Sequence, residues 1–335
     1  MDNKNIKETE VETQVEEKKE DINSLLPGAV AIPKPEKDSP DYASVIENAR
    51  LDFMKKYKAG RRNSFIVMGA VLLMAVASVI CITMNVFALK IVGWSIVGAT
   101  ILGMLIYYML TRNSLPNATK EYIAVVNEQL NIRNFSDTRF QEVSTDKTEK
   151  IELSDPISDA IYMGLNNVAS RNVINGKFDH RTFKAGDLGL YSGSGKTRTS
   201  AFVGKYVSYP NDLHFEGRYL ITLKGETPVD LPSDIEDLVV LFEADNVVIY
   251  GKADSKYASD LGKEFISKIK DIKIENHLLN LNFAIWSGHT SVYASYDDKI
   301  MTLPYQNEYD KEPNEQYAKD LLQIFDALST LVEKK

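Results

Sequence analysis

Two long uncharged runs dominate the hydrophobic pattern of the first third of the chain. Residues 64–84 and 91–110 contain no charged side chain and consist mostly of Ile, Val, Leu, Met and Ala. Runs of about 20 such residues can cross a bilayer core as helices, at about 1.5 Å of rise per residue. Because a short turn separates them, the pattern favours a transmembrane hairpin over a buried soluble hairpin or a cleaved signal peptide.

The charges that flank the two runs predict their orientation. Lysine and arginine gather on the tail side, and only Lys90 lies in the turn. Cytoplasmic flanks of membrane helices carry an excess of these residues, so we expect both tails in the cytoplasm. The tail-side basic residues are Lys55, Lys56, Lys58, Arg61, Arg62, Arg112 and Lys120.

Small residues form a stripe in the second run. Ser95, Ala99 and Gly103 recur every four residues, a spacing that lets helix backbones approach closely. We expect this stripe to pack against the first run; the alternative is contact between two copies of the chain.

The region before the first run divides into two parts. Residues 1–40 are rich in acids, lysine and proline and poor in large apolar residues, which predicts a disordered acidic tail. Residues 41–60 carry apolar side chains at three- and four-residue steps, which predicts an amphipathic juxtamembrane helix.

The pattern after the hairpin predicts a cytosolic α+β domain over residues 114–335. A helix begins near Pro116, a polar connection covers residues 135–152, and a short helix carries Ile157, Ile161, Leu165 and Val168 on one face. From residue 173 onward, short apolar strands alternate with turns. Residues 244–246 and 287–289 have the composition of hairpin turns, and helices are expected over 256–270 and 314–332. Consecutive strands with few intervening helices favour a mostly antiparallel sheet with a few packing helices.

Composition and charge exclude several classes of function. The net charge is −8 and the sequence pI about 5.2, so binding of nucleic acid through phosphates is not expected. Cys81, inside the first apolar run, is the one cysteine, which excludes an internal disulfide and cysteine-based zinc sites. The four histidines have no helical ligand spacing, and we expect no metal and no cofactor.

One motif resembles a phosphate-binding loop. Ser192–Thr197 reads SGSGKT, but the first glycine of GxxxxGK[ST] would fall at Leu190, and Gly189 is one position away. The following residues read as a strand, whereas a phosphate-binding loop opens a helix. We therefore interpret Gly195-Lys196-Thr197 as a strand connection.

Other combinations of chemistry-bearing residues are weaker. His289 could pair with Ser287 or Ser291, but no third member of a triad is marked. His180 beside Asp179 is interpreted as a surface pair, Asp297 and Asp298 as turn residues, and Trp286 as a core or interface residue. The sequence thus predicts no catalytic, cofactor-binding or metal-binding residue.

A series of short motifs follows the two spans, at residues 176–178, 183, 187–188, 197–199, 202–206, 242–250, 261–269, 283–285 and 292–294. In this order, over roughly residues 60–330, the chain resembles a family of uncharacterised bacterial membrane proteins with two N-terminal spans and a C-terminal domain of unknown function. The resemblance implies a bacterial cell membrane, and it supplies no reaction or catalytic residue. The long acidic tail departs from it, and residues 195–197 fall in a variable connection.

These observations favour a membrane-anchored cytosolic binding or scaffolding module without a catalytic site. The partners expected are the lipid bilayer and another membrane or cytosolic protein. The alternative is a membrane-bound enzyme, in the first place a nucleotide hydrolase that uses the Gly195-Lys196-Thr197 loop.

Overall fold

The computed structural model describes residues 29–34, 41–84, 86–146, 148–159, 161–162, 164–193, 197–223, 238–244, 246–301, 305 and 307–331. The chain forms two compact units. One comprises residues 1–39, 130–302 and 311–335, and the other comprises residues 40–129 and 303–310.

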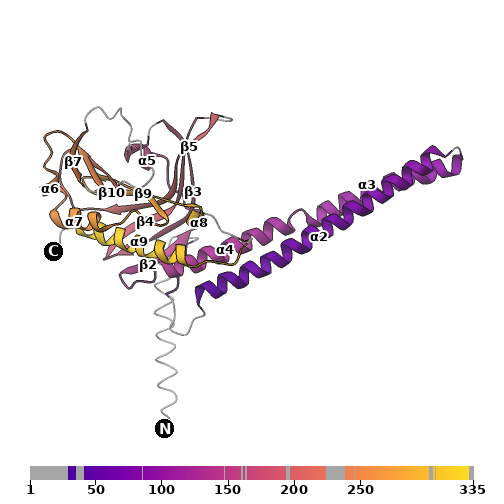
Figure 1. Ribbon diagram of the computed structural model, residues 1–335, viewed down its shortest axis with the longest axis horizontal. Helices are drawn as coiled ribbons and strands as arrows, with labels where there is room; N and C mark the ends of the chain where they lie inside the picture. The colour runs from indigo at the N-terminus through magenta and orange to yellow at the C-terminus, as the bar shows by residue number, and fades with distance from the viewer. Residues whose placement is uncertain are drawn as a thin grey trace, which may run out of the picture. The chain divides into compact units, whose positions relative to one another are not determined.

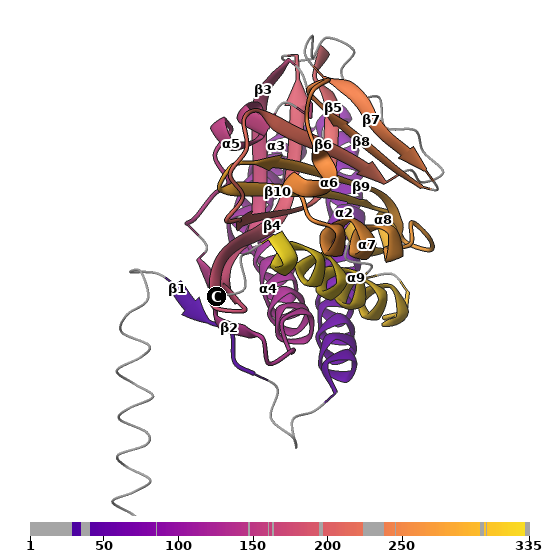
Figure 2. The same cartoon turned by 90° about the vertical axis from the view of Figure 1, so that its left-hand side faces the viewer.

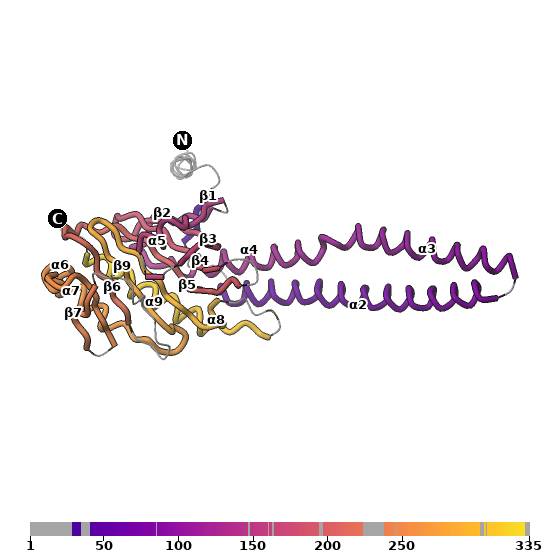
Figure 3. The backbone as a smooth tube through the Cα atoms, turned by 90° about the horizontal axis from the view of Figure 1, so that it is seen from above, coloured from indigo at the N-terminus to yellow at the C-terminus, as the bar shows by residue number. Residues whose placement is uncertain are grey.

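The helical unit contains the two apolar runs. Its helices are α2 (Tyr42–Thr83), α3 (Phe87–Thr111) and the first part of α4 (Ser114–Asn134). Figure 3 shows α2 and α3 running side by side in opposite directions. Both have the length and apolar composition needed to cross a membrane. The juxtamembrane helix expected over 41–60 and the first run form one continuous helix, with no proline between them and with Gly60 and Asn63 inside the helix.

Gly93 makes the close contact of the helical hairpin. A Cβ added there would lie 2.6 Å from Ile82 Cγ1 and 3.0 Å from the Ser78 carbonyl oxygen. The stripe of Ser95, Ala99 and Gly103 lies on an exposed face, and a Cβ added at Gly103 would meet nothing within 4 Å. The expectation that this stripe packs against the first run is therefore wrong: small side chains permit close packing but do not select the face.

This difference predicts that two Gly→Leu substitutions affect the stability of the hairpin differently. Gly93→Leu should weaken the hairpin by about 1–3 kcal/mol, because the side chain must enter occupied space. Gly103→Leu should leave the hairpin unchanged. Protease resistance and thermal stability of the full chain in detergent measure the effect. Equal behaviour of the two variants would contradict the packing described here.

The second unit is built on one antiparallel sheet, which confirms the predicted α+β class. Ten strands pair within the described residues in the order β1-β2-β3-β4-β5-β10-β9-β6-β8-β7. Figure 1 shows several of these strands, among them β3, β4 and β5, lying together in one body. The strands are β1 (Ala29–Ala31), β2 (Phe140–Asp146), β3 (Leu165–Phe178), β4 (Arg181–Ser192), β5 (Thr199–Pro210), β6 (Arg218–Leu223), β7 (Val239–Ala244), β8 (Val247–Gly251), β9 (Leu278–Trp286) and β10 (His289–Tyr296). The two predicted hairpins are present as β7–β8 and β9–β10.

Helices cover both faces of this sheet. The larger core lies under α7 (Lys263–Asp271) and α9 (Glu312–Leu328), whose apolar faces pack on Phe283, Phe178 and their neighbours. Figure 2 shows these two helices crossing the strands. A smaller core on the opposite face includes Leu188, Tyr206 and Tyr293 and lies under α5 (Ser154–Asp159) and the residues around it. The remaining short helices are α6 (Tyr257–Asp260), α8 (Asp298–Met301) and η2 (Ser329–Leu331).

Four segments differ from their predicted structure. The helix expected over 256–270 is divided into α6 and α7 at Gly262, whose φ is 80°. The sequence assigns residues 29–34 to the disordered tail. In the structure residues 29–31 form β1, which pairs with β2, and the backbone N–H of Ile32 donates to the Val143 carbonyl. The polar connection contains β2, whose Phe140 is fully buried. Leu165 and Val168, expected on a helix with Ile157, belong to β3. Cross-strand pairing with β4 overrides the helical spacing of these apolar residues.

Candidate functional site: a buried polar row on the sheet

Four polar side chains form a row across the face of the sheet that α5 covers. Tyr206, Tyr293, Asn282 and Thr222 are direct cross-strand partners on β5, β10, β9 and β6. Partners directly opposite each other project to the same face. All four are buried, with at most 5% of their surface exposed. This row places hydrogen-bonding groups where a sheet normally buries aliphatic ones.

Asp159, the last residue of α5, connects the covering segment to this face. Tyr293 donates its hydroxyl proton to Asp159 Oδ2 at 2.5 Å, and Trp286 Nε1 donates to Oδ1 at 3.3 Å. The carboxyl is 1% exposed. A buried acid with two donors aimed at it anchors α5 to β9 and β10.

Burial controls the protonation of this group. Desolvation raises the pKa of Asp159, while hydrogen bonds from Tyr293 and Ser291 and the charge of His289 oppose that rise. Burial, together with the nearby Asp159, also raises the pKa of Tyr293 well above its usual value. Tyr293 therefore keeps its proton at neutral pH and acts as a donor.

Ser291 joins the row to His289. His289 Nε2 lies 3.0 Å from Ser291 Oγ, and the Tyr206 hydroxyl lies 3.2 Å from the same oxygen. In a nucleophilic triad the serine faces the substrate, and the carboxylate bonds the imidazole nitrogen opposite it. Here Ser291 is fully buried, and Asp159 accepts hydrogen bonds from Tyr293, Trp286 and Ser291 itself instead of bonding the imidazole of His289. These buried hydrogen bonds hold α5 on the sheet. The group of Asp159, Trp286, His289, Ser291 and Tyr293 is named here the polar anchor, and Ser291 within it is not accessible to solvent.

Two buried polar atoms of this row have no hydrogen-bond partner among the described residues. They are Thr222 Oγ1 and Asn282 Oδ1, on directly paired positions of adjacent strands. The amide nitrogen of Asn282 donates to the Tyr162 hydroxyl at 3.4 Å. Buried polar groups are nearly always hydrogen-bonded, so this pair is the part of the row best suited to hold a small polar molecule.

A second buried acid lies on the opposite face of the sheet. Asp320 of α9 is 3% exposed and accepts a hydrogen bond from Gln316 Nε2 at 2.8 Å. Burial raises the pKa of Asp320 to about 6, with Glu275 adding to the rise and His277 opposing it. The hydroxyl of Tyr296, also buried, faces it and lowers this pKa.

The structure separates most residues singled out in the sequence. Ser194, Gly195 and Lys196 lie outside the described residues, and only Arg198 separates Thr197 from the strand β5. Asp179 and His180 occupy the β3–β4 turn in the left-handed region, at φ 46° and 67°. Asp297 pairs with His277 at 2.8 Å, and Asp298 opens α8.

Of the serine and histidine candidates, the structure brings together His289 and Ser291, while Ser287 donates to the Leu213 carbonyl. Trp286 belongs to the polar anchor. Sequence reasoning missed Asp159, which is one acid among 47 Asp and Glu residues and lies far along the chain from its partners. Within the part of the chain that the structure describes, no group of three His, Cys, Asp or Glu is placed to hold a metal ion.

Comparisons with known proteins do not identify this chain. No family model and no curated protein matches it. A solved structure, the crystal structure of the mycobacterial trehalose monomycolate transport factor A, TtfA, aligns at 10% identity and a TM-score of 0.28. That alignment covers 51% of this chain and 78% of the other. A TM-score this low does not establish a shared fold.

Proposed function

We propose that this protein is a membrane-anchored binding module, with α2 and α3 crossing the membrane as a hairpin and the sheet unit on the cytoplasmic side. The two helices have the required length and composition. The sheet unit then serves to bind another membrane or cytosolic protein, or a small polar molecule.

The pairing of β1 with β2 carries the topological part of this proposal. β1 precedes both apolar helices in the chain and β2 follows them, yet Ala29, Val30 and Ala31 pair in register with Asp146, Thr145 and Ser144. Strands of one sheet must lie on the same side of a bilayer. The chain must therefore cross an even number of times between them, which a two-helix hairpin satisfies.

Contacts near the N-terminal end of α2 support the same hairpin topology. Arg50 donates to the Tyr305 carbonyl oxygen at 3.2 Å, and the Tyr309 backbone N–H donates to Glu47 at 3.0 Å. Residues 305 and 309 follow the sheet strands, whereas Glu47 and Arg50 precede the first apolar run. The excess of lysine and arginine on this side supports the cytoplasmic assignment.

The burial of the polar anchor supports binding over catalysis. Ser291 is closed off from substrate, and Asp159 is occupied by neutral donors. The rival proposal, a nucleotide hydrolase, needs Gly195-Lys196-Thr197 to open a helix, and β5 follows instead.

Cysteine labelling in intact cells tests the topology. In a Cys81→Ser background, Asp41→Cys and Glu308→Cys should be protected from a membrane-impermeant thiol reagent and should react after permeabilisation. Phe87→Cys, at the start of α3 next to the turn, should react without permeabilisation. Labelling of Asp41→Cys or Glu308→Cys in intact cells would contradict the hairpin.

A further inference from the structure

The boundary between charged and uncharged residues falls at the same level on both apolar helices. On α2 the last charges before the apolar run are Arg61 and Arg62, and on the antiparallel partner the run ends at Arg112. The hydroxyls of Ser64 and Tyr107 lie 3.2 Å apart across the two helices. In a bilayer this level is where lipid phosphates lie.

A cavity opens between the helices at this level. It has a volume of about 700 Å³. Polar and charged side chains from both sides of the hairpin line it, among them Lys56, Arg61, Ser64, Tyr107, Thr111 and Ser114. Gly60 also lines it, and a Cβ added at Gly60 would meet nothing within 4 Å. The glycine leaves this space open without a packing contact of its own.

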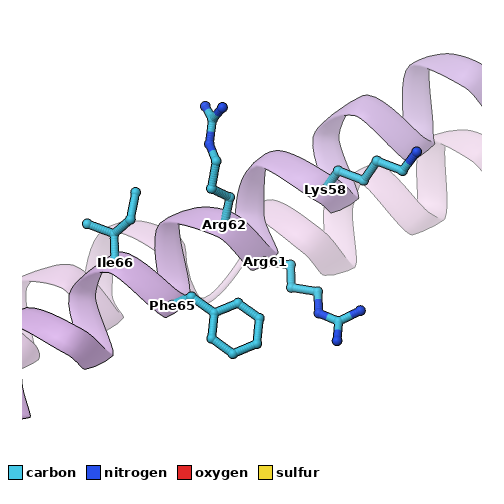
Figure 4. Close-up of a pocket in the computed structure, with 5 residues that line it drawn as sticks. All are labelled: Lys58, Arg61, Arg62, Phe65 and Ile66. Atoms are coloured by element: carbon cyan, nitrogen blue, oxygen red, sulfur yellow. The ribbon is translucent and has the colours of Figure 1, made fainter.

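Of the two cationic side chains that line the cavity, Lys56 has carboxylate partners and Arg61 has none among the described residues. Lys56 is paired with Asp52 at 3.1 Å and Glu121 at 3.0 Å. Arg61 lies over the Phe65 ring, 5.6 Å from its centroid, and Figure 4 shows the two side chains projecting on the same side of α2. Lys58 and Arg62 lie outside the cavity, on the adjoining surface that Arg61 shares with Phe65 and Ile66, and they form no ion pair with any other described residue. Guanidinium groups at a membrane surface suit phosphate, which they bind through two parallel N–H donors.

We propose that this cavity, named here the interfacial cavity, binds the headgroup of an acidic phospholipid from the cytoplasmic leaflet. Arg61 binds the lipid phosphate, and the exposed Phe65 beside it contacts the acyl chains. Basic pockets between membrane helices have this preference for anionic headgroups. The inference rests on the membrane anchoring proposed above.

Lipid retention by the full chain tests this site. The protein is reconstituted in nanodiscs of phosphatidylcholine with a minor share of phosphatidylglycerol, and the lipids that stay bound are counted by native mass spectrometry. Arg61→Gln should lower bound phosphatidylglycerol about fivefold, the size expected for one basic residue. Gly60→Phe, which fills the cavity and keeps every charge, should lower it similarly. Lys120→Gln and Gly69→Phe are the matched controls for charge and bulk, and both should retain wild-type lipid.

The possible results separate this inference from the proposed function. Wild-type retention in both Arg61→Gln and Gly60→Phe, with the protein still resistant to alkaline extraction from membranes, overturns the lipid site alone. Displacement of the lipid by inorganic phosphate assigns the cavity to a free anion and also overturns it. Release of the wild-type protein by alkaline extraction would instead contradict the membrane anchoring.

Discussion

Replacing Asp159 with alanine is expected to lower the free energy of unfolding of the sheet unit by about 3 kcal/mol. The substitution leaves the Tyr293 hydroxyl and the Trp286 indole N–H as buried donors without an acceptor, at about 1–3 kcal/mol each. Asp159→Asn should cost about 1 kcal/mol or less, because its oxygen still accepts from Trp286 and its amide can donate to Tyr293.

Tryptophan fluorescence measures this effect at the site. The chain has two tryptophans, so a Trp94→Phe background leaves Trp286 as the single reporter. Thermal unfolding is followed in detergent on the full chain, with Glu152→Ala as the control that removes an exposed acid from the same segment. Equal melting temperatures for Asp159→Ala and Glu152→Ala would show that Asp159 does not anchor α5.

Replacing Asp320 with asparagine should stabilise the protein at neutral pH and leave it unchanged in acid. Folding raises the pKa of Asp320 from 3.8 to about 6, so the native state favours the protonated acid. The unfolding free energy of the wild type therefore falls as pH rises from about 4 to 6 and stays low above that. A shift of this size corresponds to an expected gain of about 3 kcal/mol for Asp320→Asn at pH 7.

Paired unfolding curves at several pH values test this sign. The stability difference between Asp320→Asn and wild type should grow between pH 4 and 6 and then level off, with Glu275 and His277 unchanged in both proteins. Asp271→Asn, at an exposed position of α7, should follow the wild type throughout. A difference that is constant with pH would mean that Asp320 is not protonated on folding.

The sequence predicted elements where one local pattern controls the structure. The uncharged runs predict α3 and the second half of α2, and turn residues between two apolar strands predict the β9–β10 hairpin. Both signals lie within a few neighbouring residues. The antiparallel class followed from the succession of such short strands.

Long-range pairing explains what sequence reasoning missed. β1 is three residues long, and it forms a strand only because it pairs with the edge strand β2. Leu165 and Val168 have helical spacing with Ile157, but they lie in β3 because this segment pairs with β4. Asp159 has no local motif at all, since its partners Trp286 and Tyr293 come from a hairpin formed much later in the chain.

The position of β1 has a consequence for the order of assembly. β1 leaves the ribosome before the two apolar helices, and its partner β2 leaves after them. In a chain that spans the membrane, this edge of the sheet closes only after both helices have been inserted as a pair. A chain that inserts one helix alone keeps β1 and β2 on opposite sides and leaves the β2 edge open for pairing with other chains. Closure of β1 thus distinguishes correctly inserted chains from misinserted ones.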